Sequence, residues 1–337
     1  QQPGDSLRWR QHDARLAGMI VRRFPTGLLA ASLILASLAA CVPVSENVRS
    51  ASSENMEQTP VLRIAIIGDR TGGHRPEVFE NALDKIHRMQ PDLVLSVGDL
   101  VEGYIEDEEE LARQWNEVEA ELEKFGPRFH SVPGNHDYSN AVMARIWRER
   151  RGPAYWSLVK DDVLILGLST EDPPIALPQS AMEGHVRLQQ AMARDPAGTQ
   201  ERILKATRGK KKVAKPGEVS ISPEQVSYFR KVLADNPSPR WTFVLMHKPA
   251  WAYESAEFRE LEALMADRPY TVIAGHEHYY DYAARNGRDY LTLGTTGGVW
   301  LKDGPGKVDH FLWVALGEGE PTFANIEIGG IFDKKGR

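Results

Sequence analysis

From residue 61 onward, short apolar runs alternate with stretches in which apolar residues recur at helical spacing. The runs predict strands at 61–68, 92–98, 128–134, 163–168, 241–246, 270–274, 289–293, 309–315 and 322–327. The helical spacing predicts helices at about 77–89, 108–124 and 182–194. Strands that alternate with helices indicate an α/β domain. The last three predicted strands have no helix between them, so we expect them to pair as a meander.

One long stretch, 173–221, interrupts this alternation. It contains PPIALPQ, the helical pattern at 182–194 and a run of three lysines at 210–212. A polar insertion of this length predicts a surface excursion near a functional site. The lysines are either ordinary solvated side chains or a patch that attracts an anionic substrate or lipid headgroups.

The chain before residue 61 has a different pattern. Residues 27–40 carry no charge and follow Arg22 and Arg23. Fourteen residues are too few to span a bilayer, which takes about 20 apolar residues, but they match the apolar core of a secretory signal. We expect a signal peptide at 1–40, with Met19 as the start after an upstream extension (1–18), and a polar tether at 41–60. The alternative is a buried apolar helix.

Cys41 is the single cysteine and directly follows the apolar run. One cysteine cannot form an internal disulfide or a thiolate metal cluster. Residues 38–41, LAAC, resemble the lipobox of bacterial lipoproteins. The resemblance implies cleavage before Cys41 and lipidation of its thiol. We therefore expect an exported protein, anchored to the membrane of the bacterial envelope by an N-terminal lipid and facing the periplasm or the exterior.

The charge of the chain is also unevenly distributed. Lys and Arg number 41 against 47 Asp and Glu, a formal net charge of −6. Residues 1–40 hold five Arg and two Asp, so the remainder carries −9. Nucleic-acid binding requires a concentrated basic surface. We therefore expect that this acidic chain does not bind nucleic acid. With no thiolate cluster available, any metal would be held by His, Asp, Glu or Asn.

Five of the apolar runs end in side chains that can bind a metal. In chain order these are Asp69, Asp99, Asn135 with His136, His247, and His276 with His278. Ligands gather outside the carboxyl ends of strands in open α/β sheets, so these side chains can converge although they are far apart in sequence. A lone Asp after a strand is ordinarily a turn or cap residue, but five such ends favour a shared metal site.

The blocks GDR (68–70), GDLVEG (98–103), GNHD (134–137), MHKP (246–249) and GHEH (275–278) carry a family resemblance. In order and spacing they resemble the motifs of the calcineurin-like metallophosphoesterases, and GTTGG (294–298) is similar to the glycine-rich turn after the last motif. The resemblance implies an α/β fold, a four-layer α/β/β/α sandwich of two mixed sheets flanked by helices. We expect this domain at 61–330, with the insertion at 173–221 and a tail at 331–337.

The resemblance also implies metal ligands. Asp99 would bridge two divalent ions, and the remaining ligands would be Asp69 and His278 for one ion and Asn135, His247 and His276 for the other. Two such ions can bridge a phosphate and activate a water. Nitrogen and oxygen ligands without thiolate suit Mn, Fe, Zn or Co better than Ca.

Two residues of the GNHD block would act on the substrate. The resemblance implies that His136 protonates the leaving alkoxide while Asp137 holds the imidazole in the required tautomer. The expected reaction is hydrolysis of a phosphate mono- or diester by a dimetal-bound hydroxide. The alternative is a catalytically weak, metal-binding module that recognises phosphate or phosphosugar groups at the envelope.

The first block departs from the family pattern. The family has Asp-x-His, whereas this chain has Asp69, Arg70 and Thr71, followed by His74. The first ion therefore loses an imidazole, or takes His74 or a water instead. Arg70 either clamps a phosphate oxygen with its guanidinium or forms an ion pair. We expect weaker binding of the first metal.

Several further residues have two interpretations each. Glu102 either supports a ligand or caps the helix that follows it. Four aromatic residues near the His motifs either line the pocket or fill the core: Trp251, Tyr253, Tyr279 and Tyr280.

The anchor can be tested by labelling. If Cys41 is lipidated, the full chain expressed in a bacterial host with radioactive palmitate will carry label, and Cys41→Ser will carry none because the thiol is the attachment point. The measurement is radioactivity in the band of the protein. Equal labelling of both proteins would refute the anchor.

Overall fold

The computed structural model describes residues 61–210, 217–328 and 331–333. The predicted signal peptide, Cys41, the tether, two of the three lysines at 210–212 and residues 334–337 lie outside the described residues. Within the described part, no helix is both long and apolar enough to cross a membrane.

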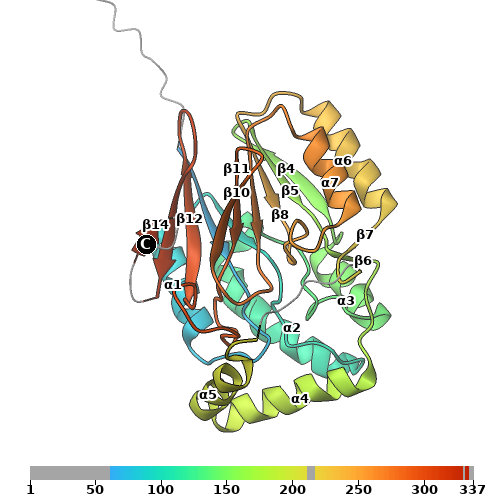
Figure 1. Ribbon diagram of the computed structural model, residues 1–337, viewed down its shortest axis with the longest axis vertical. Helices are drawn as coiled ribbons and strands as arrows, with labels where there is room; N and C mark the ends of the chain where they lie inside the picture. The colour runs from blue at the N-terminus through green and yellow to red at the C-terminus, as the bar shows by residue number, and fades with distance from the viewer. Residues whose placement is uncertain (1–60, 211–216, 329–330, 334–337) are drawn as a thin grey trace, which may run out of the picture. The chain divides into compact units, whose positions relative to one another are not determined.

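Two six-stranded mixed sheets form the centre of the fold (Figure 1). The first has the order β14-β13-β12-β1-β2-β3, in which β1, β2 and β3 are parallel and β12, β13 and β14 pair antiparallel. Its strands are β1 (Leu62–Ile67), β2 (Leu93–Ser96), β3 (Phe129–Ser131), β12 (His310–Leu316), β13 (Thr322–Glu327) and β14 (Ile331–Asp333). The last strand, β14, thus extends into the residues expected to form a tail.

The second sheet has the order β10-β11-β9-β8-β5-β4. Its four inner strands are parallel, and the edge strands β10 and β4 pair antiparallel to their neighbours. The strands are β4 (Trp156–Lys160), β5 (Val163–Gly167), β8 (Trp241–Leu245), β9 (Tyr270–Ala274), β10 (Asp281–Arg285) and β11 (Arg288–Thr292).

The predicted meander of the last strands is only partly correct. The strands β12 and β13 pair antiparallel, but β11 lies in the other sheet, parallel to β9. The reason is a hairpin between β10 and β11 around Asn286 and Gly287, both with positive φ (51° and 70°). An Asn-Gly pair favours such a two-residue turn, and this hairpin delivers β11 to the second sheet.

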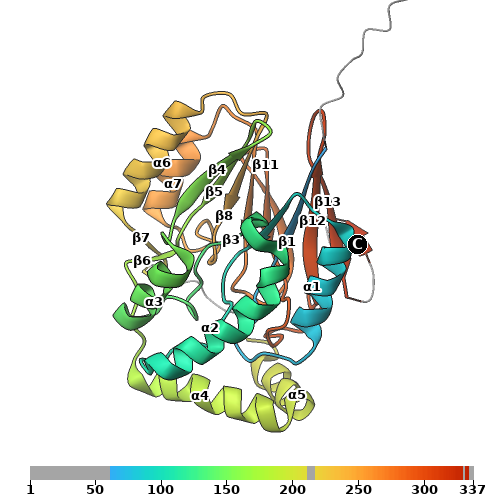
Figure 2. The same cartoon turned by 180° about the vertical axis from the view of Figure 1, so that it is seen from behind.

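Helices cover the outer face of each sheet, which gives the expected four-layer α/β/β/α order (Figure 2). The first sheet is covered by α1 (Val78–Met89), α2 (Glu108–Leu122), the 3-10 helix η1 (Glu123–Arg128) and α3 (Ala141–Arg151). The second is covered by α6 (Pro223–Asp235) and α7 (Ala256–Leu264).

The inner strands are buried on both faces. In β1, Ala65 and Ile67 pack against the helices, whereas Leu62, Ile64 and Ile66 pack against the second sheet. Burial on both faces explains why the inner strands are continuous apolar runs rather than alternating ones.

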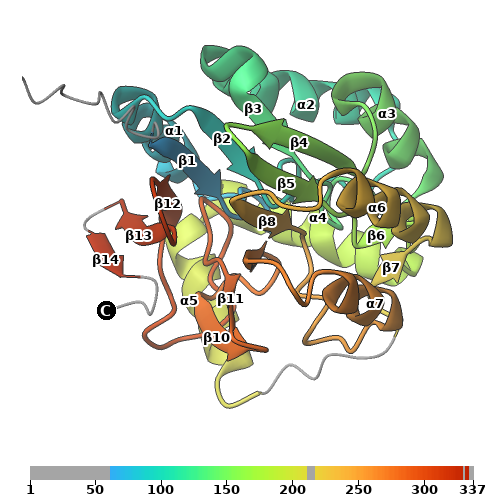
Figure 3. The same cartoon turned by 90° about the horizontal axis from the view of Figure 1, so that it is seen from above.

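The insertion forms an excursion of its own. The short parallel strands β6 (Glu171–Asp172) and β7 (Ser220–Ile221) enclose it. Between them lie α4 (Gln179–Arg194) and α5 (Pro196–Thr207), and in α4 Met192 is the one buried residue. Figures 1 and 3 show these two helices at an end of the sandwich rather than on its helix-covered faces.

The core between the sheets can be tested with Leu245→Ala. Leu245 is fully buried in the cluster that joins the two sheets, so the cavity should lower the free energy of unfolding by about 2–5 kcal/mol. Leu264→Ala, at a residue 39% exposed, should cost less than about 1 kcal/mol. Denaturant unfolding of both variants measures the difference, and equal losses would contradict this packing.

Candidate active site

The metal-capable residues follow the carboxyl ends of parallel strands from both sheets. Asp69 and Asp99 follow β1 and β2, whereas His247 follows β8 and His276 follows β9. The structure brings them together in two overlapping groups, in each of which the possible ligand atoms lie within 4.8 Å of one another. The convergence of strand ends predicted from the sequence is therefore observed.

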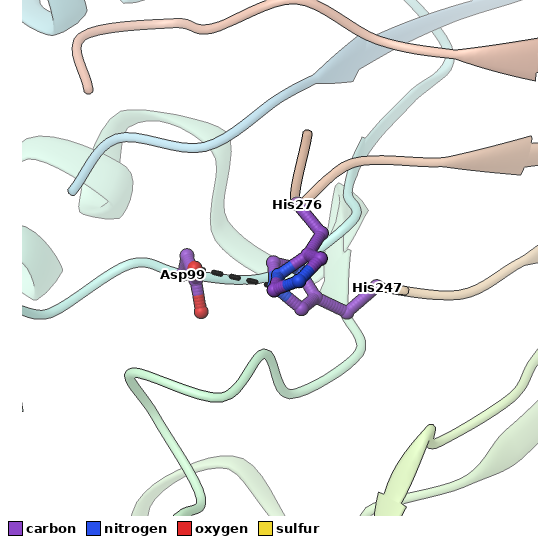
Figure 4. A group of neighbouring side chains, drawn as sticks. All are labelled: Asp99, His247 and His276. Atoms are coloured by element: carbon purple, nitrogen blue, oxygen red, sulfur yellow. Dashed lines mark hydrogen bonds and ion pairs between the residues drawn. The ribbon is translucent and has the colours of Figure 1, made fainter. Parts of the chain in front are cut away.

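The first group joins Asp99, His247 and His276 (Figure 4). The Nε2 atom of His247 lies 3.2 Å from Asp99 Oδ2 and 3.2 Å from His276 Nδ1. Asn135 Oδ1 lies 2.9 Å from the same Nε2. The family resemblance assigns Asp99, Asn135, His247 and His276 to one ion. In the structure the other three lie around Nε2 of His247.

The second group joins Asp69, Asp99 and His278. His278 Nε2 lies 3.1 Å from Asp69 Oδ2. Asp69 also accepts hydrogen bonds from the backbone N–H of His276 at 3.0 and 3.1 Å, which ties the two strand ends together. Asp99 is the residue that both groups share, the position expected of a bridging carboxylate.

The orientation of the imidazoles fits a metal. His247 Nδ1 bonds the carbonyl of Val97 at 2.9 Å, and His278 Nδ1 bonds the carbonyl of Val299. A neutral ring that donates from Nδ1 presents a lone pair at Nε2, and a backbone partner on the other nitrogen is typical of metal-binding histidines. Nitrogen and oxygen lone pairs that face one another at about 3 Å repel unless a proton or a metal ion lies between them.

The electrostatics of the cluster also favour positive charge. Burial lowers the pKa of His247, but the negative charges of Asp99, Asp69 and Glu171 together outweigh burial and raise that pKa to about 9. Burial raises the pKa of Asp99, while His247 and His136 lower it below its ordinary range. The carboxylates thus favour positive charge at the cluster, which a divalent ion would supply.

Two glycines leave the space that the carboxylates of Asp69 and Asp99 occupy. A Cβ on Gly134 would lie 2.1 Å from Asp99 Oδ1, and a Cβ on Gly275 would lie 2.4 Å from Asp69 Oδ1. Any larger residue at either position would displace a carboxylate of the cluster.

Asp137 does not hold the imidazole of His136, contrary to the expectation. Its two carboxylate oxygens accept four backbone N–H bonds, from Asp99, Leu100, Val101 and Gly134, at 2.7–3.1 Å. The carboxylate is fully occupied by main-chain donors and fixes the loop that carries Asp99. Burial and the charge of Asp99 raise the pKa of Asp137, although the backbone hydrogen bonds act in the opposite direction and lower it.

His136 is oriented by a backbone carbonyl instead. Its Nδ1 lies 2.7 Å from the carbonyl oxygen of Glu102, which leaves Nε2 for a substrate. The Glu102 carboxylate accepts the backbone N–H groups of Gly73 and His74, so neither interpretation of Glu102 from the sequence describes it fully. The cap of α2 is Asp107.

The altered first block points away from the cluster. The Thr71 hydroxyl bonds the backbone carbonyls of Asp99 and Val101, at 2.9 and 2.8 Å. Arg70 is buried and pairs with Glu117 at 2.6 Å, which is the ion-pair alternative rather than a phosphate clamp.

His74 also lies away from the cluster. It lines a separate pocket of about 300 Å³ together with Arg70, and it belongs to neither ligand group. Burial lowers the pKa of His74 to about 4. The second group therefore has one imidazole, that of His278.

The cavity at the cluster, about 450 Å³ in volume, contains residues that the sequence analysis did not identify. Tyr104 accepts a hydrogen bond from Asn135 Nδ2–H through its hydroxyl oxygen and stacks on His185 of α4, with ring centroids 4.3 Å apart. Lys248 is buried and pairs with Glu171 at 2.8 Å. In the sequence, only the position of Lys248 directly after His247 could have indicated that it lines the cavity. Nothing in the sequence pointed to Tyr104 or His185.

The four ambiguous aromatic residues lie beside the cluster rather than in it. Trp251 and Tyr290 pack edge to face, and the hydroxyl of Tyr253 donates to Glu277 at 3.0 Å. Tyr280 is buried against His310, and Lys302 lies over the ring of Tyr279. None of the four is among the residues that line the described cavity.

Comparisons with known proteins identify the family of the chain. The sequence profile of the calcineurin-like phosphoesterases matches residues 62–280. The chain therefore belongs to the calcineurin-like phosphoesterase family, and it is a phosphoester hydrolase by class. Members of such a family use divalent metal ions, for which the two ligand groups are the candidates. No curated protein sequence matches the chain.

Solved structures share the fold at low sequence identity. A dimetal phosphatase from Danio rerio is 16% identical, with a TM-score of 0.53 over 82% of this chain and 100% of that chain. The purple acid phosphatase PPD1 from yellow lupin (Lupinus luteus) is 13% identical, with a TM-score of 0.55 over 82% of this chain and 53% of that chain. A structure of PhoD is 9% identical, with a TM-score of 0.52 over 82% and 72%.

The role of the close-fitting glycines can be tested with Gly275→Ala. The added methyl group would lie 2.4 Å from Asp69 Oδ1, so Asp69 must move and Mn²⁺ should bind at least about tenfold more weakly. Calorimetric titration of the metal-free protein with Mn²⁺ measures this. Gly184→Ala is the control, because its Cβ would meet no atom closer than 3.8 Å. Unchanged affinity in Gly275→Ala would show that Asp69 is not a ligand.

Proposed function

We propose that this protein hydrolyses a phosphate mono- or diester at a centre of two divalent ions that share Asp99. The observation that carries the proposal is the membership of Asp99 in both ligand groups. The site lies in a cavity that also contains His136, so a phosphate held at the cluster would lie beside a group able to transfer a proton.

When bound, the two ions would supply positive charge that polarises the phosphate and lowers the pKa of an attacking water. The chain would hold them with Asp69, Asp99 and His278 on one side and with Asp99, Asn135, His247 and His276 on the other. These nitrogen and oxygen donors suit Mn, Fe, Zn or Co.

His136 would act on the leaving group. Its Nδ1–H donates to the carbonyl of Glu102, so the doubly protonated ring would carry a second proton on Nε2 and give that proton to the departing alkoxide. Asp137 would contribute by holding the backbone of Asp99 and Gly134 in place, and Tyr104 would hold the amide of Asn135.

The proposal is tested with chromogenic substrates. The purified chain with added Mn²⁺ is expected to hydrolyse 4-nitrophenyl phosphate or bis(4-nitrophenyl) phosphate, and Asp99→Asn should reduce turnover to background because both ligand groups lose their shared carboxylate. Nitrophenolate release is the measurement. An inactive wild type, or an Asp99→Asn variant of full activity, would refute the proposal.

Proton donation by His136 predicts a dependence on the leaving group. His136→Ala should lower kcat for a simple alkyl phosphate by about 10²–10⁴-fold, because an alkoxide needs a proton to leave. The loss for a nitrophenyl ester should be much smaller, since nitrophenolate leaves without one. Release of inorganic phosphate and of nitrophenolate measures the two losses. Equal losses for both esters would contradict a proton-donating role.

A second function is favoured by one observation, the loss of an imidazole at position 71. The chain would then be a weakly catalytic module that binds one ion and recognises phosphate or phosphosugar groups. Metal analysis by mass spectrometry separates the two proposals. Two ions with turnover support the enzyme, whereas one ion with phosphate affinity and no turnover supports the module.

We also propose that the domain works at the bacterial envelope, tethered through Cys41. The support for this location is the apolar segment 27–40 and the LAAC stretch of the sequence.

A further inference from the structure

The α4 helix has an apolar stripe that the core does not use. Ala181, His185 and Leu188 are spaced i, i+4 and i+7, so they share one helix face. Each of them is only partly buried, whereas Met192, one turn further, is buried. An apolar stripe on a helix ordinarily packs against the core, and this one instead lines the cavity of the metal cluster.

The stripe is fixed in place at two points. A Cβ on Gly73 would lie 3.4 Å from Met192 Cγ and 3.5 Å from Leu188 Cδ2, so α4 packs on the loop that follows Asp69. One turn before Leu188, His185 stacks on Tyr104 with an interplanar angle of 17° and meets His136 edge to face at 5.1 Å.

Aliphatic side chains from two other segments complete the same surface. Ile175 and Leu177 precede α4, and Leu301 follows the glycine-rich turn. We call Ile175, Leu177, Ala181, Leu188 and Leu301 the aliphatic wall. All five line the cavity that also contains Asp99, His136 and His278.

Two charged groups of this cavity, Lys248 and Glu171, are already paired with each other. The Lys248 ammonium donates to the Glu171 carboxylate and to the Glu218 carbonyl, both at 2.8 Å. The aliphatic wall has no such partners, and binding of an apolar group there would remove its surface from water.

We propose that the substrate is a phosphate ester with an aliphatic chain, which lies along the aliphatic wall while the phosphate lies at the metal cluster. This inference rests on the proposed hydrolytic function and specifies its substrate class. His185, which shares a helix face with Ala181 and Leu188, meets the His136 ring, so the part of the substrate closest to the phosphate would meet Leu188 and Ala181.

The test is a chain-length series. Two sets of esters are assayed with the wild type and Mn²⁺: n-alkyl phosphates from ethyl to octyl by phosphate release, and 4-nitrophenyl alkyl phosphates by nitrophenolate release. In at least one set, kcat/KM should rise by ~3-fold per methylene until the wall is filled. Between ethyl and pentyl this amounts to roughly 30-fold.

Two wall variants, Leu188→Gln and Leu177→Gln, should each reduce this ethyl-to-pentyl ratio to less than about fivefold. Leu264→Gln is the matched control, because Leu264 is exposed on α7 and does not line the cavity; its ratio should equal that of the wild type. Two variants are used so that misfolding of one still leaves a measurement.

The outcomes separate the inference from the function on which it rests. Turnover of the esters with no dependence on chain length would overturn the aliphatic substrate and leave the hydrolase proposal standing. A chain-length dependence that neither wall variant reduces would also overturn the inference. No turnover of any ester would overturn both proposals.

Discussion

The geometry of the site depends on the buried carboxylate of Asp137, which is not among the residues that line the cavity. Asp137 accepts the backbone N–H groups of Asp99, Leu100, Val101 and Gly134, and so it joins the loops that leave β2 and β3. Hydrogen bonds to a charged group contribute about 1.5–3 kcal/mol each, and buried donors without a partner are costly. Asp99 has a φ of 56°, a conformation unfavourable for a residue with a Cβ, and these bonds hold it there.

The sequence predicted the positions of the ligand groups because two simple patterns coincided. An apolar run buried on both faces identifies an inner strand, and a polar residue directly after it must lie at the carboxyl edge of the sheet. Asp69, Asp99 and His247 were found in this way. The layers of the fold followed from the family resemblance, and the packing of α1 and α6 on opposite sheets agrees with it.

Side-chain direction could not be predicted from the same patterns. Arg70 and Asp137 are each adjacent to a predicted functional residue, yet Arg70 turns toward Glu117 and Asp137 toward the main chain. Apart from Gly134, their partners come from loops and helices distant in sequence, so spacing alone carries no signal of them. His185 was missed for the same reason, because its contact with Tyr104 exists only once the insertion is folded.

The insertion and the metal cluster differ in how firmly they are tied to the core. The ligands lie at the ends of strands that are mostly buried between the layers, where a substitution disturbs both sheets. The α4 helix contributes one buried residue, so most of its positions can change at little cost in stability. The part of the protein that we propose contacts the body of a substrate can therefore diverge during evolution while the proposed metal site stays constant.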